Sequence, residues 1–163
     1  MIILGIDPSV RGTGYAVIEV RGKETRALTF GRIYNAPALT QSQCLKNIYQ
    51  QVGKIIEMYH PDSAALEGII YVQNRATAIA LGAARGAAMV AIAENNISIH
   101  EYPARSIKKA TTGYGKAAKN QVGFMMRAIF KLTGTPNPDA ADALAIALTH
   151  AQSSQWHKSG RRI

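Results

Sequence analysis

Three apolar runs joined by short, glycine-containing turns fill the first 35 residues, and they constrain the fold more than any other feature. The runs are IILGI at 2–6, YAVIEV at 15–20 and TRALTFGRIYN at 25–35, and the turns are PSVRGTG and GK. Short apolar runs separated by tight turns are typical of an antiparallel meander. The chain is therefore expected to begin with three paired strands on which the remainder packs.

Helical and strand patterns alternate along the rest of the chain. Apolar residues recur every three or four positions in the helical segments, and short apolar runs bounded by turns mark the strands. Strands are expected at 63–69 and 97–102, helices at 40–59, about 74–94, 119–132 and 139–152, and a short helix with a loop at 104–115. This order predicts an α/β domain in which helices flank one mixed sheet of five strands.

The length of 163 residues predicts one domain, which we assign to 1–153, followed by a basic, flexible tail at 154–163. The single cysteine, Cys44, excludes a disulfide framework and a cysteine-rich zinc site, and favours a reducing, cytoplasmic location. No signal-peptide pattern opens the chain. The most apolar run, 76–93, carries Arg85 at its centre, where a lone charge is costly in lipid. We expect a buried or interface helix there, and no membrane.

The net charge of +9 favours a polyanionic partner, most simply nucleic acid. The alternative is a protein that is merely basic. The distribution of charge supports the first interpretation, because no acidic residue lies between Glu101 and Asp139. That segment holds seven cations, Arg105, Lys108, Lys109, Lys116, Lys119, Arg127 and Lys131. A continuous basic region of this kind is expected to face the partner.

Four of the ten acidic residues stand in apolar surroundings, where an unpaired charge is disfavoured. Asp7 and Glu67 each end an apolar strand, and Asp139 and Asp142 open an apolar helix three residues apart. Clustered carboxylates suit hard divalent cations such as Mg²⁺ or Mn²⁺. Two such ions about 4 Å apart can activate a water and stabilise the leaving oxygen of a phosphodiester. Acids and charge together indicate metal-dependent hydrolysis of nucleic acid.

Each acid also has a local interpretation. In isolation, Asp139 and Asp142 would more simply complement the helix dipole, which contributes ~0.3–1 kcal/mol each. Asp7 could cap the turn at DPS. Glu67 has no routine local role, so the joint pattern favours a site. The four histidines show no metal-ligand spacing, and GTG lacks the following helix that a dinucleotide fingerprint requires.

Four blocks, ILGIDPSVRGTGYAVI, ALEGI, LGAARGAAM and DAADALAIALTHA, resemble the RuvC family of Holliday junction resolvases. The resemblance covers residues 2–152, with the blocks in family order. It implies an RNase H-like fold, a homodimer, and Mg²⁺-dependent symmetrical nicking of a four-way DNA junction in recombination and repair. The products would carry 5′-phosphate and 3′-hydroxyl ends. RuvA and RuvB are candidate partners by the same resemblance.

The family's acidic tetrad falls on Asp7, Glu67, Asp139 and Asp142, which would hold two Mg²⁺ ions, with Mn²⁺ as a substitute. Some members carry a histidine at the third position, where this chain has aspartate. Two family lysines match Lys108 and Lys119. Beyond the family pattern, Lys109, Lys116 and Arg75 are further candidates for phosphate contacts.

One departure from the family concerns the segment after Glu67, which reads EGIIYVQN. Ile70 stands where the family usually has an aromatic residue that stacks on opened bases, and Tyr71 follows it. Tyr71 either takes over the stacking or packs in the dimer, and we favour stacking slightly.

Gly82 and Gly86 lie on one face of the long helix, and small residues let two helices approach closely. We expect this face in a dimer interface, with internal helix-on-sheet packing as the alternative. Two other functional classes stay open: an actin-like phosphotransferase, which GIDPSVRGTGYAVI also suggests, and a DNA-architectural protein that binds without cutting.

Overall fold

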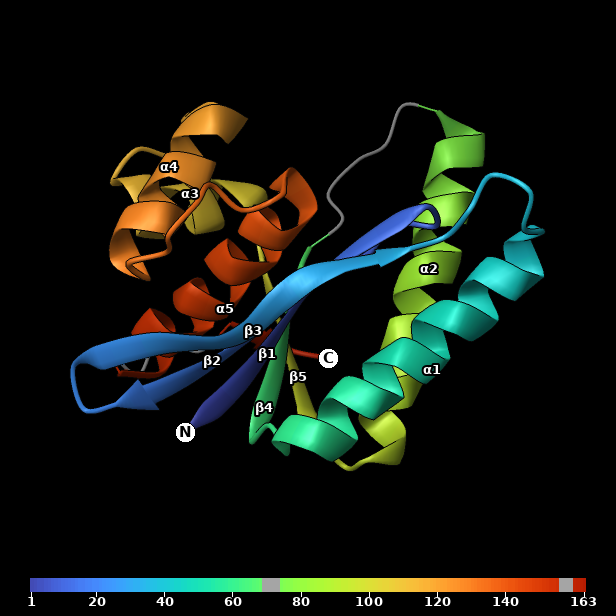
Figure 1. Ribbon diagram of the computed structural model, residues 1–163, viewed down its shortest axis with the longest axis horizontal. Helices are drawn as coiled ribbons and strands as arrows, with labels where there is room; N and C mark the ends of the chain where they lie inside the picture. The colour runs from blue at the N-terminus through green and yellow to red at the C-terminus, as the bar shows by residue number, and fades with distance from the viewer. Residues whose placement is uncertain (69–73, 156–159) are drawn as a thin grey trace.

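The computed structural model describes residues 1–68, 74–155 and 160–163, and its elements form two helical layers around one sheet (Figure 1). The strands are β1 (Ile2–Asp7), β2 (Gly12–Arg21), β3 (Glu24–Tyr34), β4 (Ser63–Glu67), β5 (Ser98–Tyr102) and β6 (Arg161–Arg162). The helices are α1 (Gln41–Tyr59), α2 (Arg75–Glu94), α3 (Ala104–Thr112), α4 (Lys119–Ile129) and α5 (Pro138–Gln155). Helices α1 and α2 cover one face of the sheet, and α3, α4 and α5 lie on the other.

The sheet is mixed, with strand order β3-β2-β1-β4-β5-β6. Strands β1, β2 and β3 form the predicted antiparallel meander, and β1, β4 and β5 run parallel. Parallel neighbours need helical crossovers, which α1 and α2 provide. Side chains alternate between the faces, so Leu4 and Ile6 pack under α1 and α2 while Ile3 packs against α5.

Within the described residues, the sheet has six strands instead of the predicted five, because β6 pairs antiparallel with the outer edge of β5. Gly160 makes this possible, since a Cβ there would lie 2.6 Å from the Glu101 carbonyl oxygen. Its N–H donates to the Tyr102 hydroxyl at 3.1 Å. Two arginines carry no apolar alternation, so nothing in their sequence predicts a strand. The flexibility of the tail stays a prediction, since residues 156–159 lie outside the described part.

Helix α5 rests directly on β1 and β2 because glycines face it. A Cβ at Gly5 would lie 2.2 Å from the Ala143 carbonyl oxygen, and one at Gly14 would lie 2.0 Å from that of Asp139. No larger residue fits at either position without moving the helix. The start of α5 is therefore held against the strand end that carries Asp7, which pairs with Gly14.

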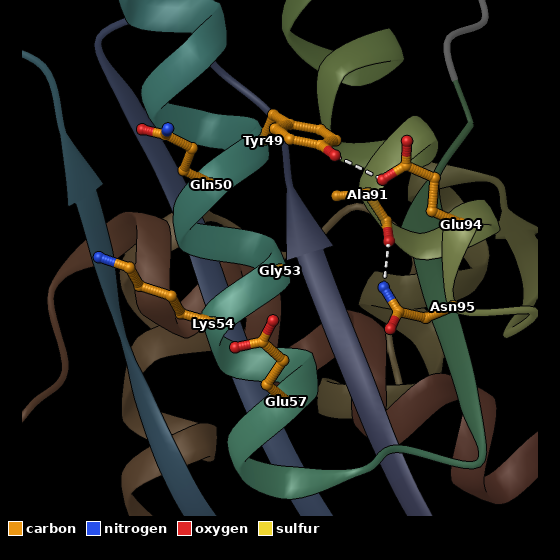
Figure 2. Close-up of a pocket in the computed structure, with 8 residues that line it drawn as sticks. All are labelled: Tyr49, Gln50, Gly53, Lys54, Glu57, Ala91, Glu94 and Asn95. Atoms are coloured by element: carbon orange, nitrogen blue, oxygen red, sulfur yellow. Dashed lines mark hydrogen bonds between the residues drawn. The ribbon is translucent and has the colours of Figure 1, made fainter.

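Helices α1 and α2 lie side by side and are joined at the end of α2 (Figures 1 and 2). The Tyr49 hydroxyl of α1 donates to a Glu94 carboxylate oxygen at 2.5 Å. The pocket between the helices measures about 380 Å³ and contains none of the predicted site residues. It takes no part in the site described below.

Helix α2 is the one described helix that is long and apolar enough to cross a membrane by length and composition. A single such helix is weak grounds for a membrane span. Its inner side packs against α1 and β5, with Ala84, Ala88 and Ile92 fully buried. Its outer side exposes Ile79 and Val90. Helix α2 therefore has one covered and one open face, and its place in an interface stays a prediction.

Candidate active site

A cavity of about 240 Å³ lies where β1 and β4 end beneath α3, α4 and α5. It gathers three of the four predicted acids and two of the predicted lysines. Its lining consists of Asp7, Glu67, Asp142, Lys108 and Lys119, with Ala104, Ile107 and Val122 as apolar walls. Acids separated by up to 135 positions in the sequence thus share one pocket.

Strand register brings Asp7 and Glu67 to the same edge of the sheet. Both are the last residues of their strands, and the strands run parallel with Ile6 opposite Leu66. Strands β1 and β4 therefore end side by side, with Asp7 and Glu67 at their ends. Asp142 reaches the cavity from the second turn of α5, which the glycine contacts hold against β1 and β2. The sheet supplies two acids and the helix a third.

The cavity holds more negative charge than its surroundings favour. Burial raises the pKa of Asp7 to about 7, and the carboxylates of Asp142 and Glu67 add to the effect. Burial is also the main cause that raises the pKa of Glu67 and that of Asp142. Each group would ionise more readily if a cation entered the cavity.

Lys119 provides part of the compensating charge. Its Nζ atom lies 3.4 Å from the Asp142 carboxylate, and this contact raises the pKa of Lys119 and partly offsets the rise that burial causes in the pKa of Asp142. The Lys119 side chain is 81% exposed. Because most of the Lys119 side chain is in solvent, its ammonium group can turn from the Asp142 carboxylate to an incoming phosphate.

Asp139, the fourth predicted acid, is not among the residues that line the cavity. Its carboxylate pairs with Arg32 of β3, with the Nε and Oδ2 atoms 2.9 Å apart. Asp139 is close enough to raise the pKa of both Asp7 and Asp142. No pattern along the chain indicates Arg32, because its position follows from the pairing of Gly14 with Arg32 across the β2–β3 register.

Arg85 is a second residue whose role the sequence analysis missed. One guanidinium nitrogen donates to the backbone carbonyl of Glu67 at 2.7 Å, and the other lies 3.5 Å from the Glu101 carboxylate. Only 11% of its side chain is exposed. A lone arginine in an alanine-rich helix was a usable signal, since a buried guanidinium must find partners. Arg85 links α2 to the strand end that carries Glu67.

The other predicted contact residues do not line the cavity. Lys109, Lys116 and Arg75 are exposed on α3, on the loop that follows it and at the start of α2. Tyr71 lies outside the described residues, as does Ile70.

The donor set fits a hard divalent cation. Oxygen ligands from carboxylates are what Mg²⁺ prefers. The pKa of Asp7 is raised first by burial and then by the neighbouring carboxylates, whose negative charge a cation would offset. Within the described ranges, no three His, Cys, Asp or Glu side chains already form a group that could hold a metal ion. The ion pairs with Arg32 and Lys119 each engage one carboxylate oxygen, Oδ2 of Asp139 and Oδ2 of Asp142.

The family model described as crossover junction endodeoxyribonuclease RuvC matches residues 3–150. The chain belongs to the RuvC family. A RuvC of Akkermansia muciniphila is 48% identical over 154 residues, covering 94% of this chain and 92% of that protein. One of Bordetella avium is 44% identical over 153 residues, covering 94% and 84%. The predicted family is confirmed.

A solved structure described as T. thermophilus RuvC in complex with Holliday junction substrate superimposes with a TM-score of 0.93. It is 31% identical in sequence, and the match covers 100% of this chain and 99% of that one. This RuvC match confirms the RNase H-like fold. RuvC enzymes are metal-dependent crossover junction endodeoxyribonucleases of DNA recombination and repair.

Proposed function

We propose that this chain resolves four-way DNA junctions by nicking two opposed strands at the Asp7–Glu67–Asp142 cavity. The observation that carries the proposal is the shared pocket, in which three carboxylates meet Lys108 and Lys119. The products carry 5′-phosphate and 3′-hydroxyl ends, as the family resemblance implies.

In the proposed reaction, Asp7, Glu67 and Asp142 would hold two Mg²⁺ ions, for which Mn²⁺ could substitute. Asp139, which pairs with Arg32, would be the fourth ligand. When bound, the ions supply Lewis acidity for the attacking water and the departing 3′ oxygen. Lys119, released from Asp142, neutralises phosphate charge beside the cut.

The DNA arms follow the acid-free basic segment. Lys108, Lys109, Lys116 and Lys119 contact phosphates on the side of α3 and α4, and Arg75 does so at the start of α2. We also retain Tyr71 as the residue that stacks at the crossover. We also propose that the enzyme is soluble and cytoplasmic and that it acts with RuvA and RuvB.

A synthetic four-way junction tests the proposed function directly. We expect paired, symmetrical nicks with Mg²⁺ and none after chelation with EDTA. Ligation of the product by a DNA ligase, without prior phosphorylation, would support the proposed ends. Tight junction binding with no nicking under any divalent cation would instead favour an architectural DNA-binding protein.

A dimer through the outer face of α2 brings two cavities to a two-fold symmetric junction. A Cβ at Gly82 or Gly86 would meet nothing within 4 Å, which contradicts the alternative that these glycines pack on the sheet. We expect Gly86→Leu to keep the fold but give monomers in sedimentation analysis. Gly53→Leu is a matched control, because Gly53 of α1 has equally open space. A dimer that survives Gly86→Leu would contradict this interface.

Lys119→Ala tests the phosphate contact. Junction affinity should fall, and the slope of log K against log salt should decrease by about 1, because one fewer counterion is released. Fluorescence anisotropy at four salt concentrations measures the slope. Lys23→Ala is the matched control, since Lys23 is exposed in the β2–β3 turn. A slope equal to that of the unmodified protein would exclude this contact.

Arg85→Met tests the link between α2 and Glu67. Loss of the 2.7 Å bond to the Glu67 carbonyl should lower the nicking rate by roughly 10- to 100-fold, as for other residues that support metal ligands. Junction affinity should stay within a factor of about two or three. Glu101→Gln keeps the carbonyl bond and should cost less. Equal losses in both variants would assign the effect to the ion pair alone.

A further inference from the structure

A groove of about 350 Å³ opens between α4 and the loop that follows α3. Its lining is Thr112, Tyr114, Ala117, Asn120, Gln121, Phe124 and Met125. Tyr114 and Phe124 are large apolar residues, yet 62% and 65% of their surfaces are exposed. Neighbouring exposed aromatic residues that line a groove are typical of an interaction site. The acidic cavity does not use either residue.

The groove and the catalytic cavity open on adjacent sides of the first turns of α4. Lys119 and Val122 line the cavity, whereas Asn120 and Gln121 line the groove. A helix with its side chains is ~10–12 Å across, and bases on one stacked DNA strand follow every ~3.4 Å. A strand leaving the cavity thus reaches the groove within about three or four nucleotides.

The positive charge around the groove favours an anionic partner. No acidic residue lies between Glu101 and Asp139, and Lys116, Lys119 and Arg127 belong to the same loop and helix as the groove. A second copy of this basic chain does not complement that charge. The proposed dimer face, on α2, also lies on the other side of the sheet (Figure 1). The position beside the cavity favours nucleic acid over an acidic protein.

The polar groups of the groove suit the edge of a base. The carboxamide oxygens of Gln121 and Asn120 accept from the backbone N–H groups of Ala118 and Gln121, at 2.8 and 2.9 Å. The NH₂ groups of these two lining residues are donors that do not take part in those two bonds. Base carbonyl and ring-nitrogen atoms are acceptors.

We propose that this groove binds one or two unpaired bases of the substrate strand, with the Tyr114 and Phe124 rings stacking on them. The inference deepens the proposed function, on which it rests. Aromatic residues stack on any base, so the groove contributes affinity for opened DNA with little sequence preference. Its residues come from the segment 112–125, which does not include Tyr71, so the two stacking assignments are tested by different substitutions.

Binding of a fluorescent oligothymidylate 12-mer, measured by anisotropy in EDTA, tests the groove without cleavage. Phe124→Ala and Tyr114→Ala should each weaken binding by roughly 5- to 150-fold, as expected for one lost base stack. The salt slope should not change, because no phosphate contact is removed. Phe124→Trp should keep the affinity. Met58→Ala is the control, since Met58 is 71% exposed on α1, across the sheet.

A second measurement uses a junction with 2-aminopurine at each of the four positions beside the nick. We expect quenching at one or more positions, and its loss in Phe124→Ala. If both alanine variants kept the affinity and the quenching of the unmodified protein, base binding in the groove would be contradicted. It would also be contradicted if the variants differed from the unmodified protein only in the slope of log K against log salt. If the unmodified protein binds the oligonucleotide through these rings yet never nicks a junction, the proposed function fails and the groove stands.

Discussion

Asp7→Asn is expected to abolish nicking of a four-way junction while leaving junction binding largely intact. Asp7 is the most buried of the acids that line the cavity, and burial with two neighbouring carboxylates raises its pKa to about 7. Asparagine keeps the shape but removes the charge that would hold a cation. The rate should fall by about 10³-fold or more, equivalent to ~4 kcal/mol of transition-state stabilisation.

Single-turnover nicking, with the enzyme in excess, separates this loss from any change in affinity. Asp62→Asn is the control, because Asp62 precedes β4 at the end opposite Glu67 and asparagine can still accept the Ile2 N–H. Its rate should match that of the unmodified protein. A normal rate for Asp7→Asn would sink the carboxylate mechanism, and lost binding would show that Asp7 mainly supports the DNA surface.

The same substitution should stabilise the protein without metal at alkaline pH. The folded-state pKa of Asp7 is raised from about 3.8 to about 7, so the folded protein binds more protons than the unfolded chain between these values. Stability therefore decreases as pH rises from about 4 to about 7. At ~1.4 kcal/mol per pKa unit, Asp7→Asn should recover about 2–4 kcal/mol at pH 8.

Thermal unfolding in EDTA measures this gain, which corresponds to roughly 4–16 °C for a chain of this size. The difference between the two proteins should shrink toward zero near pH 4, where Asp7 is protonated in the fold. Mg²⁺ should reverse the order at pH 8, because only the carboxylate form gains from the cation. A variant less stable than the unmodified protein at pH 8 in EDTA would contradict the raised pKa.

The helices and strands and the site acids could be predicted from the sequence, because both leave local signals along the chain. Helix α1 begins after Thr40, whose side chain accepts from the Gln43 N–H, and α2 begins after Asn74, which caps it in the same way. Glu67 was recognisable because a charge that ends an apolar strand needs a partner. These features depend on neighbours along the chain, so apolar periodicity and helix-capping preferences predict them.

The features that the sequence did not predict depend on contacts between distant segments. Arg32 meets Asp139 only because of the β2–β3 register, and β6 forms only because β5 has a free edge. The pairing of Asp139 with Arg32 also separates it from the cavity that the other three acids line. Spacing alone predicted that Asp139 and Asp142 aim at one place, and the ion pair holds one of them aside.

The glycines under α5 have an evolutionary consequence. Gly5 of β1 and Gly14 of β2 let α5, which carries Asp139 and Asp142, pack directly on the strand pair that carries Asp7. The relative positions of these acids therefore depend on packing inside the fold. Surface positions that do not line the cavity, such as Tyr114 and Phe124 of the groove, can then change without altering the arrangement of the acids. New substrate preferences can be selected there, while the hydrolytic centre is inherited unchanged.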